Sequence, residues 1–440
     1  MDSVPILEDY GLSPHHGFLP SEFPIERLSN PYYYKWENVI TNLQGLILNK
    51  HLREVIDKLP VLSTAGLVLD SERRRAYSIL CFMAHSYIWG HDTPSERLPP
   101  PIAVPLLHIS AYLEVPPVAT YSALCLWNFK GLFNGEEIDN PENLATHITF
   151  TGSTEESWFY LISVAIEARG ASSIPLMLQA IKSARLNDLE KVAESLRTFA
   201  GIIGELGKLL EKMHDRCDPH IFYHRIRPFL AGSKNMQNAG LANGIIYEDG
   251  SGSEEFKQYA GGSNAQSSLI QFFDIILGIE HLPTNERKSN LTPFTKEGGL
   301  LPPPSQNFIL EMREYMPGPH RRFLESVSKV ANIRQLVYAN LDNEELSLAY
   351  DACLKVLSDF RSIHIRIVSR YIILKSRELK STSFLKRSEP HCLNEDVSTP
   401  TSIFLESYSA EKNLKGTGGT SLIPFLKQVR DETLYCAVNA

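Results

Sequence analysis

The chain of 440 residues contains few cysteines, six in all, and none of them forms a CxxC pair. Several, such as Cys81 in SILCFMAH and Cys353 in AYDACLKVL, stand among apolar neighbours. Secreted disulfide scaffolds carry dense cysteines, whereas scattered thiols in apolar surroundings are typical of reduced, buried side chains. This pattern argues against a disulfide framework, and we expect a soluble, cytoplasmic protein.

Three further features are scarce: a leader-like N-terminus, long apolar runs and excess basic charge. The first residues, MDSVPILEDYGLS, lack the basic segment and apolar core of a secretory signal. Stretches of about 18 apolar residues without charge or proline are missing, so we expect no membrane span. Lys plus Arg is 43 and Asp plus Glu is 51, which gives a net charge of −8. We therefore expect neither nucleic acid nor a membrane as partner.

The common catalytic motifs are absent too: GxSxG, GxGxxG after a strand, a Walker loop and HExxH. His214 and His220 flank Cys217, but a predicted helix end breaks their spacing and no second cluster completes a zinc site. Hydrolase and nucleotide chemistry therefore have no local support.

What the sequence does contain is helical periodicity. Apolar residues recur at three- and four-residue steps most regularly in 187–213 and 344–375, and Asn187 with Glu190 predicts a capping box at the start of the first helix. Shorter helical patterns cover 36–58, 71–89, 118–130, 155–169, 175–184, 266–279, 306–315 and 319–329. The best strand pattern is ITFTG at 148–152. The sequence predicts an all-α fold.

Turn formers and acidic residues in GLFNGEEIDNPEN predict a domain boundary. We expect a small N-terminal helical domain at 1–135, a linker at 136–152 and a large helical domain at 153–440. Within the large domain, residues 233–263 are rich in Gly, Ser and Asn, and residues 376–420 are polar. Loops of such length are usually functional or disordered, so a mobile loop is expected at about 376–420.

One histidine lies on the apolar face of a predicted long helix. His364 shares this face with positions 353, 357, 360, 367, 368 and 371, so its ring is predicted to point inward. It is either a core histidine whose ring nitrogens are hydrogen-bonded, or a neutral imidazole that serves as an axial ligand of haem iron. Arg361, one turn earlier, is correspondingly either solvated or placed to meet a haem propionate.

Two other segments combine residues suited to ligand binding. In YAGGSNAQSSLIQFFDIILGIEH, residues 259–281, a glycine pair permits close backbone approach and hydroxyls cap the following helix. In DPHIFYHRIRPFLAGSKN, residues 218–235, Arg227 follows two aromatic residues and is suited to clamp a carboxylate. The plainer alternatives are a loop-to-helix junction and a surface cation.

Seven segments, taken in chain order, carry a family resemblance: YSALCLW, ESWFYLISVAIE, HIFYHRIRPFLAGSK, FKQYAGGSNAQSSLIQFFDIILGI, MREYMPGPHRRFL, AYDACLKVLSDFRSIHIRIVSRYIIL and KGTGGTSLIPFLKQVR. They resemble the indoleamine 2,3-dioxygenases from about residue 77 to the C-terminal region. The resemblance implies a monomeric, all-α enzyme containing haem b, active as Fe(II) and reduced by a separate electron donor. It further implies insertion of both atoms of O₂ across the indole C2–C3 bond of L-tryptophan. The product, N-formylkynurenine, opens the kynurenine pathway toward NAD.

The resemblance also implies roles for individual residues. His364 becomes the proximal iron ligand, Arg361 lies near a propionate, Asp274 supports haem binding, and Arg227 binds the substrate carboxylate. The other implied contacts are a distal wall of Tyr121, Phe159 and Ser163, then Phe222 and Tyr223 beside the arginine, Gly262 and Ser263 over the haem edge and substrate ammonium, and Thr417 in the mobile loop. None of these residues is expected to act as a general acid or base.

Three positions depart from the vertebrate pattern of that family. Leu124 stands where those members have a pocket cysteine, Trp158 replaces a glycine, and Asn264 replaces an alanine. We expect these changes to alter substrate affinity more than the reaction. The alternative function is a haem protein that binds O₂ or senses haem without turning over tryptophan. Such a carrier needs no carboxylate clamp, which argues against it.

Overall fold

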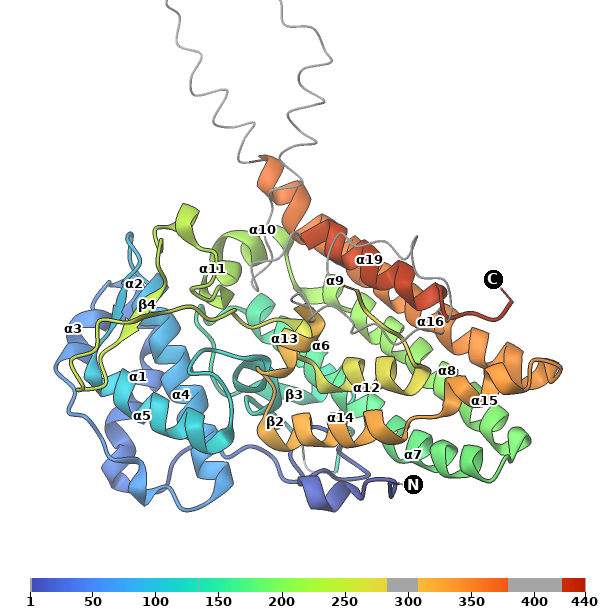
Figure 1. The fold of residues 1–440 in the computed structure, drawn as a ribbon. Coiled ribbons are helices and arrows are strands. Elements are labelled where there is room, and N and C mark those ends of the chain that lie inside the picture. The colour runs from blue at the N-terminus through green and yellow to red at the C-terminus, as the bar shows by residue number, and fades with distance from the viewer. Residues whose placement is uncertain (1, 134, 283–307, 379–421, 440) are drawn as a thin grey trace, which may run out of the picture.

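The computed structural model describes residues 2–133, 135–282, 308–378 and 422–439, which form mainly helices (Figure 1) and confirm the predicted all-α class. The first group of helices comprises α1 (Tyr34–Thr41), α2 (Leu43–Leu48), α3 (Leu52–Asp57), α4 (Asp70–Trp89) and α5 (Pro100–Leu113). The longer helices of the second group are α6 (Thr154–Gly170), α7 (Ser173–Arg185), α8 (Leu189–Glu211), α12 (Ser268–Leu277), α14 (Gly318–Val330), α16 (Glu344–Val368) and α19 (Leu422–Leu434). Its short helices are α9 (Met213–Arg216), α10 (Pro219–Ile221), α11 (Arg227–Leu230), α13 (Phe308–Arg313) and α15 (Ile333–Ala339).

The strands are only two or three residues long. In one small sheet, β1 (Arg97–Leu98) pairs in parallel with β4 (Ile245–Tyr247), and β4 pairs antiparallel with β5 (Phe256–Lys257). A separate antiparallel pair joins β2 (Phe129–Gly131) to β3 (Leu144–Thr146). The first sheet ties a segment beyond α11 back to the N-terminal helices.

Several local predictions are wrong because tertiary contacts outweigh the local pattern. Segment 148–152 is not a strand, since its backbone amides donate to the carboxylate of Glu156 at the start of α6. The pattern at 36–58 is divided into α1, α2 and α3. The pattern at 118–130 contains a single π-helical turn, Ser122–Leu126, followed by β2.

Helix α5 was missed because its proline content argues against a helix. Pro100 occupies the first helical position, where an N–H is not needed, and Pro105 lies inside the helix. Its buried apolar side chains, among them Ile102 and Leu106, pack on the protein interior. Burial of this face compensates for the hydrogen bond lost at the internal proline.

The two long predicted helices are confirmed as α8 and α16, but the start of α8 differs in detail. Its N-cap is Asp188, whose side chain accepts a hydrogen bond from the Lys191 amide at 3.1 Å. Asn187 precedes the cap in the left-handed region, with φ of 57°. The capping box predicted from Asn187 and Glu190 is therefore wrong by one residue.

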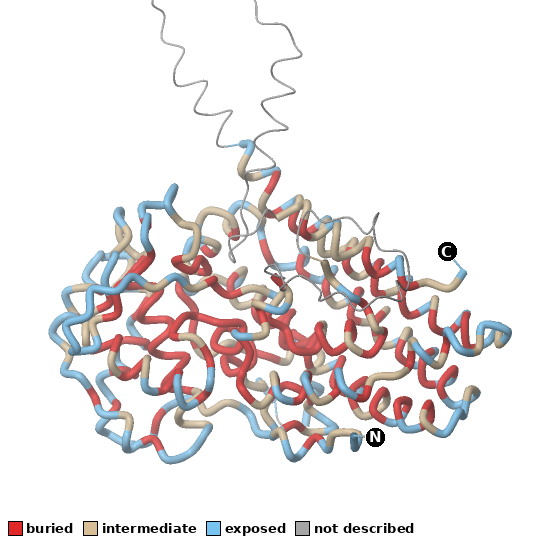
Figure 2. Tube along the Cα trace, in the orientation of Figure 1, coloured by how far each residue is buried: buried red, intermediate tan, exposed pale blue. Residues whose placement is uncertain are grey.

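The buried side chains form a continuous core that runs through both helical groups (Figure 2). Phe150, from the predicted linker, lies 4.4 Å from Phe82 of α4 and 5.0 Å from Phe229 of α11, measured between ring centroids. The division into domains at 1–135 and 153–440 stays a prediction. The five cysteines within the described ranges are free and buried, as their apolar surroundings predicted.

Within the described ranges, one segment is long and apolar enough to cross a membrane by length and composition alone. It is Thr154–Arg185, which comprises α6 and α7, with a mean hydropathy of 1.3 in its most apolar window. The segment contains Glu167, Arg169 and Pro175, so it is not an apolar run free of charge and proline, and the expectation that no segment spans a membrane stays a prediction. In the fold, 72% of that window is buried inside the protein, which is the usual position of an apolar core helix.

The cap of α8 gives a first testable prediction. Asp188→Ala should lower the free energy of unfolding by about 1 kcal/mol, because an amide at the helix start loses its acceptor. Glu190→Ala is the matched control in the same turn and should change stability by less than about 0.5 kcal/mol, because Glu190 is exposed and does not cap the helix. Urea denaturation followed by circular dichroism measures both. An equal loss in the Glu190 variant would contradict the prediction, because it would show that the cap at Asp188 is not the distinctive source of stability at this helix end.

Candidate functional site

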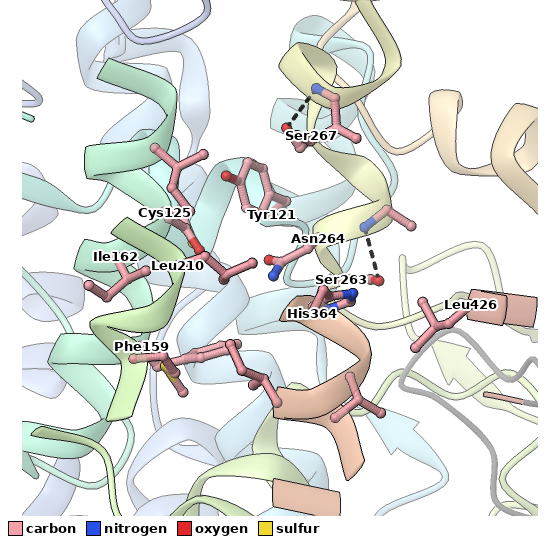
Figure 3. Close-up of a pocket in the computed structure, with 18 of the residues that line it drawn as sticks. Tyr121, Cys125, Phe159, Ile162, Leu210, Ser263, Asn264, Ser267, His364 and Leu426 are labelled. Atoms are coloured by element: carbon pink, nitrogen blue, oxygen red, sulfur yellow. Dashed lines mark hydrogen bonds between the residues drawn. The ribbon is translucent and has the colours of Figure 1, made fainter. Parts of the chain in front are cut away.

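A large cavity is lined by residues from α6, α12, α16 and α19 (Figure 3). Its volume, including the part open to solvent, is about 1910 Å³. Most sequence-predicted site residues meet here: Tyr121, Phe159, Ser163, Phe222, Arg227, Gly262, Ser263, Asp274, Arg361 and His364.

His364 reaches the cavity from α16, and the predicted apolar face of this helix is confirmed by buried Leu357 and Val368. The imidazole is half-buried, and within the described residues neither ring nitrogen has a hydrogen-bond partner. Burial lowers the pKa of His364 to about 4, so the ring is neutral at pH 7. His85 shows the contrast, because its Nδ1 contacts the Phe229 carbonyl at 2.7 Å and its Nε2 accepts from the Ala119 amide at 3.0 Å. His364 is therefore not a core histidine with satisfied nitrogens.

Aromatic and hydroxyl side chains form another part of the wall. Phe159 and Ser163 lie one turn apart on α6. Tyr121 comes from the segment before β2, and Figure 3 shows it with Phe159 around the cavity. The Phe159 ring is 4.9 Å from the Phe222 ring, measured between centroids. Among the described lining residues His364 is the only histidine, so this wall offers hydroxyls and rings but no imidazole.

Three π-helical turns within the described chain contribute to the cavity. They span Ser122–Leu126, Phe222–Ile226 and Ser369–Ile373, and each supplies lining residues, Leu124 and Tyr371 among them. A π turn inserts a residue into a helix and redirects the side chains on both sides, and such turns are frequent at functional sites. The sequence carried no signal for them, because their apolar spacing resembles that of an ordinary helix.

Arg227 follows one of these turns and begins α11. Its guanidinium lies over the ring of Tyr223 at 5.6 Å from the centroid. Burial lowers the pKa of Arg227, and Tyr223 opposes this shift. Tyr223 itself does not line the cavity, so it acts on the site through Arg227. Thr417 and most of the predicted loop at 376–420 lie outside the described residues.

The glycine pair of the 259–281 segment is required by contacts within the protein. A Cβ atom on Gly261 would lie 2.0 Å from the Leu230 carbonyl oxygen, and one on Gly262 would lie 2.4 Å from Leu124 Cδ1. Ser263 then caps the next turn by accepting from the Ala265 amide at 3.3 Å. The loop can therefore border the cavity only because these two residues lack side chains.

A buried chain of alternating charges borders the cavity, and sequence reasoning missed half of it. Arg361 donates to Asp274 at 2.5 Å, and the other Asp274 oxygen lies 3.0 Å from His281 Nε2. His281 Nδ1 lies 2.7 Å from a carboxylate oxygen of Glu432 in α19. All four side chains are at least nine-tenths buried, so Arg361 is not a solvated cation. This row of charges fastens α19 to α12 and α16. The paired residues are far apart in the sequence, so local sequence patterns cannot reveal the contacts.

The side chains in this row of alternating charges stabilise one another's ionised forms. Burial lowers the pKa of His281, but the carboxylates of Asp274 and Glu432 together raise it by more than burial lowers it. The net pKa of His281 is therefore raised. Burial raises the pKa of Asp274, whereas Arg361 and His281 lower it to below its usual value. The pKa of Glu432 is likewise lowered, mainly by His281 against burial. The ionised form of each group is therefore stabilised by its neighbours.

The three residues that depart from the vertebrate pattern differ in where they lie relative to the cavity. Leu124 and Asn264 line the cavity, as expected, and Figure 3 shows the Asn264 amide pointing into it. Trp158 does not line the cavity, because its indole Nε1 donates to the Lys212 carbonyl at 2.8 Å instead. Trp158 therefore has no direct contact with the cavity, and its expected effect on substrate affinity stays a prediction.

The fold and site define a class of all-α protein in which one neutral histidine and two arginines, Arg227 and Arg361, line an apolar cavity. The family model for indoleamine 2,3-dioxygenase matches residues 6–436. An indoleamine 2,3-dioxygenase of Saccharomyces cerevisiae is 42% identical and covers 99% of this chain and 95% of its own length. A 6-hydroxytryptophan 2,3-dioxygenase of Fusarium equiseti is 37% identical, with 98% of each chain covered, and human indoleamine 2,3-dioxygenase 2 is 32% identical over 98% of this chain and 96% of its own. The chain belongs to the indoleamine 2,3-dioxygenase family, which confirms the resemblance.

The charge chain predicts a specific pH dependence of stability. The folded-state pKa of His281 is raised above its usual value of 6.5, so its contribution is fully present below that pH and is lost as pH rises through the folded-state pKa. His281→Gln should therefore unfold more easily than the wild type by about 1–3 kcal/mol at pH 6, and the difference should shrink toward pH 9.

Urea denaturation at several pH values measures this difference. His108→Gln is the control, because His108 is exposed on α5 and should leave the pH profile unchanged. A His281→Gln effect that stays constant from pH 6 to pH 9 would show that hydrogen bonding, and not the charge of His281, stabilises the chain.

Proposed function

We propose that this chain is a haem-dependent dioxygenase that converts L-tryptophan and O₂ to N-formylkynurenine. The observation that carries the proposal is the pairing, in one apolar cavity, of the open imidazole of His364 with the half-buried guanidinium of Arg227. The first is suited to bind iron, and the second is suited to bind a carboxylate. Membership of the dioxygenase family supports this assignment.

The residues present fit a haem group. His364 would hold the iron, since a neutral imidazole without a competing partner is a good iron ligand. Arg361 borders the cavity one turn away and would face a propionate, while Asp274 holds the guanidinium in place. The largely apolar lining suits a large, flat, apolar macrocycle.

Haem, when bound, supplies the redox chemistry with O₂ that amino-acid side chains lack. The chain itself binds and orients the substrate. Arg227 would bind the carboxylate through charge-assisted hydrogen bonds worth about 1.5–3 kcal/mol. Phe159 and Phe222 would pack on the indole and exclude water. Both oxygen atoms end in the product, at indole C2 and C3, so the net reaction consumes no other oxidant.

General-base catalysis by the hydroxyl wall is not part of this proposal. Burial raises the pKa of Tyr121 well above its usual value, and Glu167 raises it further, so the phenol stays neutral. Ser163 can donate or accept a hydrogen bond but takes up no proton at neutral pH. The wall therefore acts by shape and hydrogen bonding.

The choice of L-tryptophan among related indoles rests on the family. One relative is named for 6-hydroxytryptophan, so ring substituents are accepted by some family members. In this chain Leu124 and Asn264 border the cavity and would tune affinity among such substrates. We further propose a cytoplasmic monomer, reduced by a separate electron donor, that opens the kynurenine pathway toward NAD.

The alternative is a haem protein that binds O₂ or senses haem without turnover. The purified, reduced, haem-loaded protein, given L-tryptophan and air, decides between the two by absorbance of N-formylkynurenine. Product formation supports the dioxygenase. A stable oxygenated haem spectrum without product would favour the carrier or sensor, and failure to take up haem would overturn both.

His364→Ala should abolish haem retention, because the iron loses its protein ligand. The ratio of haem to protein absorbance after reconstitution and gel filtration measures this. His320→Ala is the control: His320 is also buried, contacts Ser268 at 3.2 Å and lies outside the cavity lining, so this variant should keep its haem. Full haem content in the His364 variant would remove this residue as ligand.

Arg227→Ala should raise the KM for L-tryptophan at least tenfold, since loss of a charge-assisted contact of about 1.5–3 kcal/mol weakens binding by that factor or more. Haem content should not change. Arg225→Ala is the control, because Arg225 is exposed two residues earlier in the same segment. An unchanged KM for the Arg227 variant would exclude this residue from the substrate site.

A further inference from the structure

An acid other than Asp274 lies behind the cavity wall, and the function proposed above gives it no catalytic or binding role. Glu167, on α6, is 1% exposed. Its Oε1 accepts two hydrogen bonds, from Tyr121 Oη at 3.1 Å and from Ser267 Oγ at 2.6 Å. Its Oε2 is fully buried and has no hydrogen-bond partner among the described residues. A buried carboxyl oxygen without a partner is costly, so its retention calls for an explanation.

One oxygen of Glu167, Oε1, connects three parts of the cavity wall. The first is α6 itself, which carries Phe159 and Ser163. The second is the segment of Tyr121, which leads into the π turn. The third is the start of α12, where Ser267 is the N-cap and accepts from the Ile270 amide at 3.4 Å. Movement of the Glu167 carboxyl would therefore move all three parts.

Gln266 strengthens the same junction. Its Oε1 accepts from the Tyr121 amide at 2.8 Å, and its Nε2 donates to the Gly261 carbonyl at 2.8 Å. The loop of Gly261 and Gly262 is thereby fixed to the Tyr121 segment, while Glu167 fixes that segment to α6. The junction links the loop over the cavity to the aromatic wall.

Glu156 offers an internal comparison on the same helix. It is as buried as Glu167, yet its two oxygens accept from the Phe150 and Thr151 amides and from the hydroxyls of Thr151 and Tyr160. Its hydrogen-bonding capacity is filled, as expected for an acid that only stabilises the fold. Glu167 has only hydroxyl donors, and both of them line the cavity.

The surroundings of Glu167 favour its neutral form. Burial raises its pKa to about 7, against the hydrogen bonds from Ser267 and Tyr121. The titratable groups that face it are Tyr121 and Cys125, and burial raises the pKa of both, so neither is charged near neutral pH. Glutamine, which is neutral and of the same shape, is therefore a close substitute for this side chain at pH 7 and below.

We propose that Glu167 is a positioning residue for the dioxygenase reaction, and this inference rests on the proposed function. Through Tyr121 and Ser267 it sets the spacing between the aromatic wall and the loop over the cavity, and so the placement of the indole. Arg227 supplies affinity at the other end of the substrate. Loss of Glu167 should therefore lower kcat more than it weakens binding, because misplacement of the reacting atoms costs rate.

The test uses the haem-loaded enzyme and the variants Glu167→Leu and Glu167→Gln at pH 6.5. Leucine removes the acceptor and keeps the approximate volume, whereas the glutamine carbonyl can still accept from both hydroxyls. We expect kcat for Glu167→Leu to fall at least tenfold, the equivalent of about one hydrogen bond, and Glu167→Gln to keep kcat within about threefold of the wild type. The dissociation constant of L-tryptophan, from the substrate-induced change in haem absorbance, should change less than about threefold in both.

Glu156→Gln is the matched control, and its kcat should equal that of the wild type. A Glu167→Leu enzyme with wild-type kcat would overturn the proposal, and so would equal losses in the leucine and glutamine variants. If Glu167→Leu does not fold, Ser267→Ala replaces it, because this change removes the shorter of the two bonds; an unchanged kcat there is equally decisive against the proposal. Inactive wild-type enzyme would instead overturn the proposed function, so the two failures are distinguishable.

Discussion

The packing of α16 against α8 is the contact on which the site depends, because it fixes the helix that carries His364. The two helices approach each other closely at Gly207 of α8, where a Cβ would lie 3.2 Å from Ile363 Cδ1, whereas a Cβ on Gly204 would make an ordinary contact with Val356 at 3.7 Å. Cys353 adds a hydrogen bond to the Leu196 carbonyl at 3.0 Å. With one side of α16 held in this way, its neighbouring side is free to face the cavity.

The cavity is apolar, and this property governs how its polar groups behave. A buried charge or hydroxyl in such surroundings needs a partner. Arg361 forms an ion pair with Asp274, which also contacts His281. Tyr121 and Ser267 both donate hydrogen bonds to Glu167. The imidazole of His364 is the contrasting case, because its nitrogens are left open toward the cavity. In a protein interior, an open polar group of this kind is typical of a site for a ligand and not of packing.

The helices that border the cavity are irregular where they reach it. π turns at Ser122–Leu126, Phe222–Ile226 and Ser369–Ile373 interrupt otherwise regular segments, and the glycine pair at 261–262 lets a loop pass close to two other segments. The regular parts of α6, α8 and α16 provide a rigid frame for these irregular parts. This arrangement places side chains that a continuous helix would point elsewhere.

The sequence by itself determined the helical class, the long helices α8 and α16, and the inward position of His364, since these follow from apolar residues at helical spacing along one segment. Family resemblance located ten of the cavity-lining residues by their motifs. Only the tertiary structure decided that His281 and Glu432 extend the Arg361–Asp274 pair, that Glu167 joins three wall segments, and that Trp158 faces away from the cavity. These features depend on contacts between residues up to about 150 positions apart. Local periodicity contains no information on such contacts, because they arise only when separate helices pack.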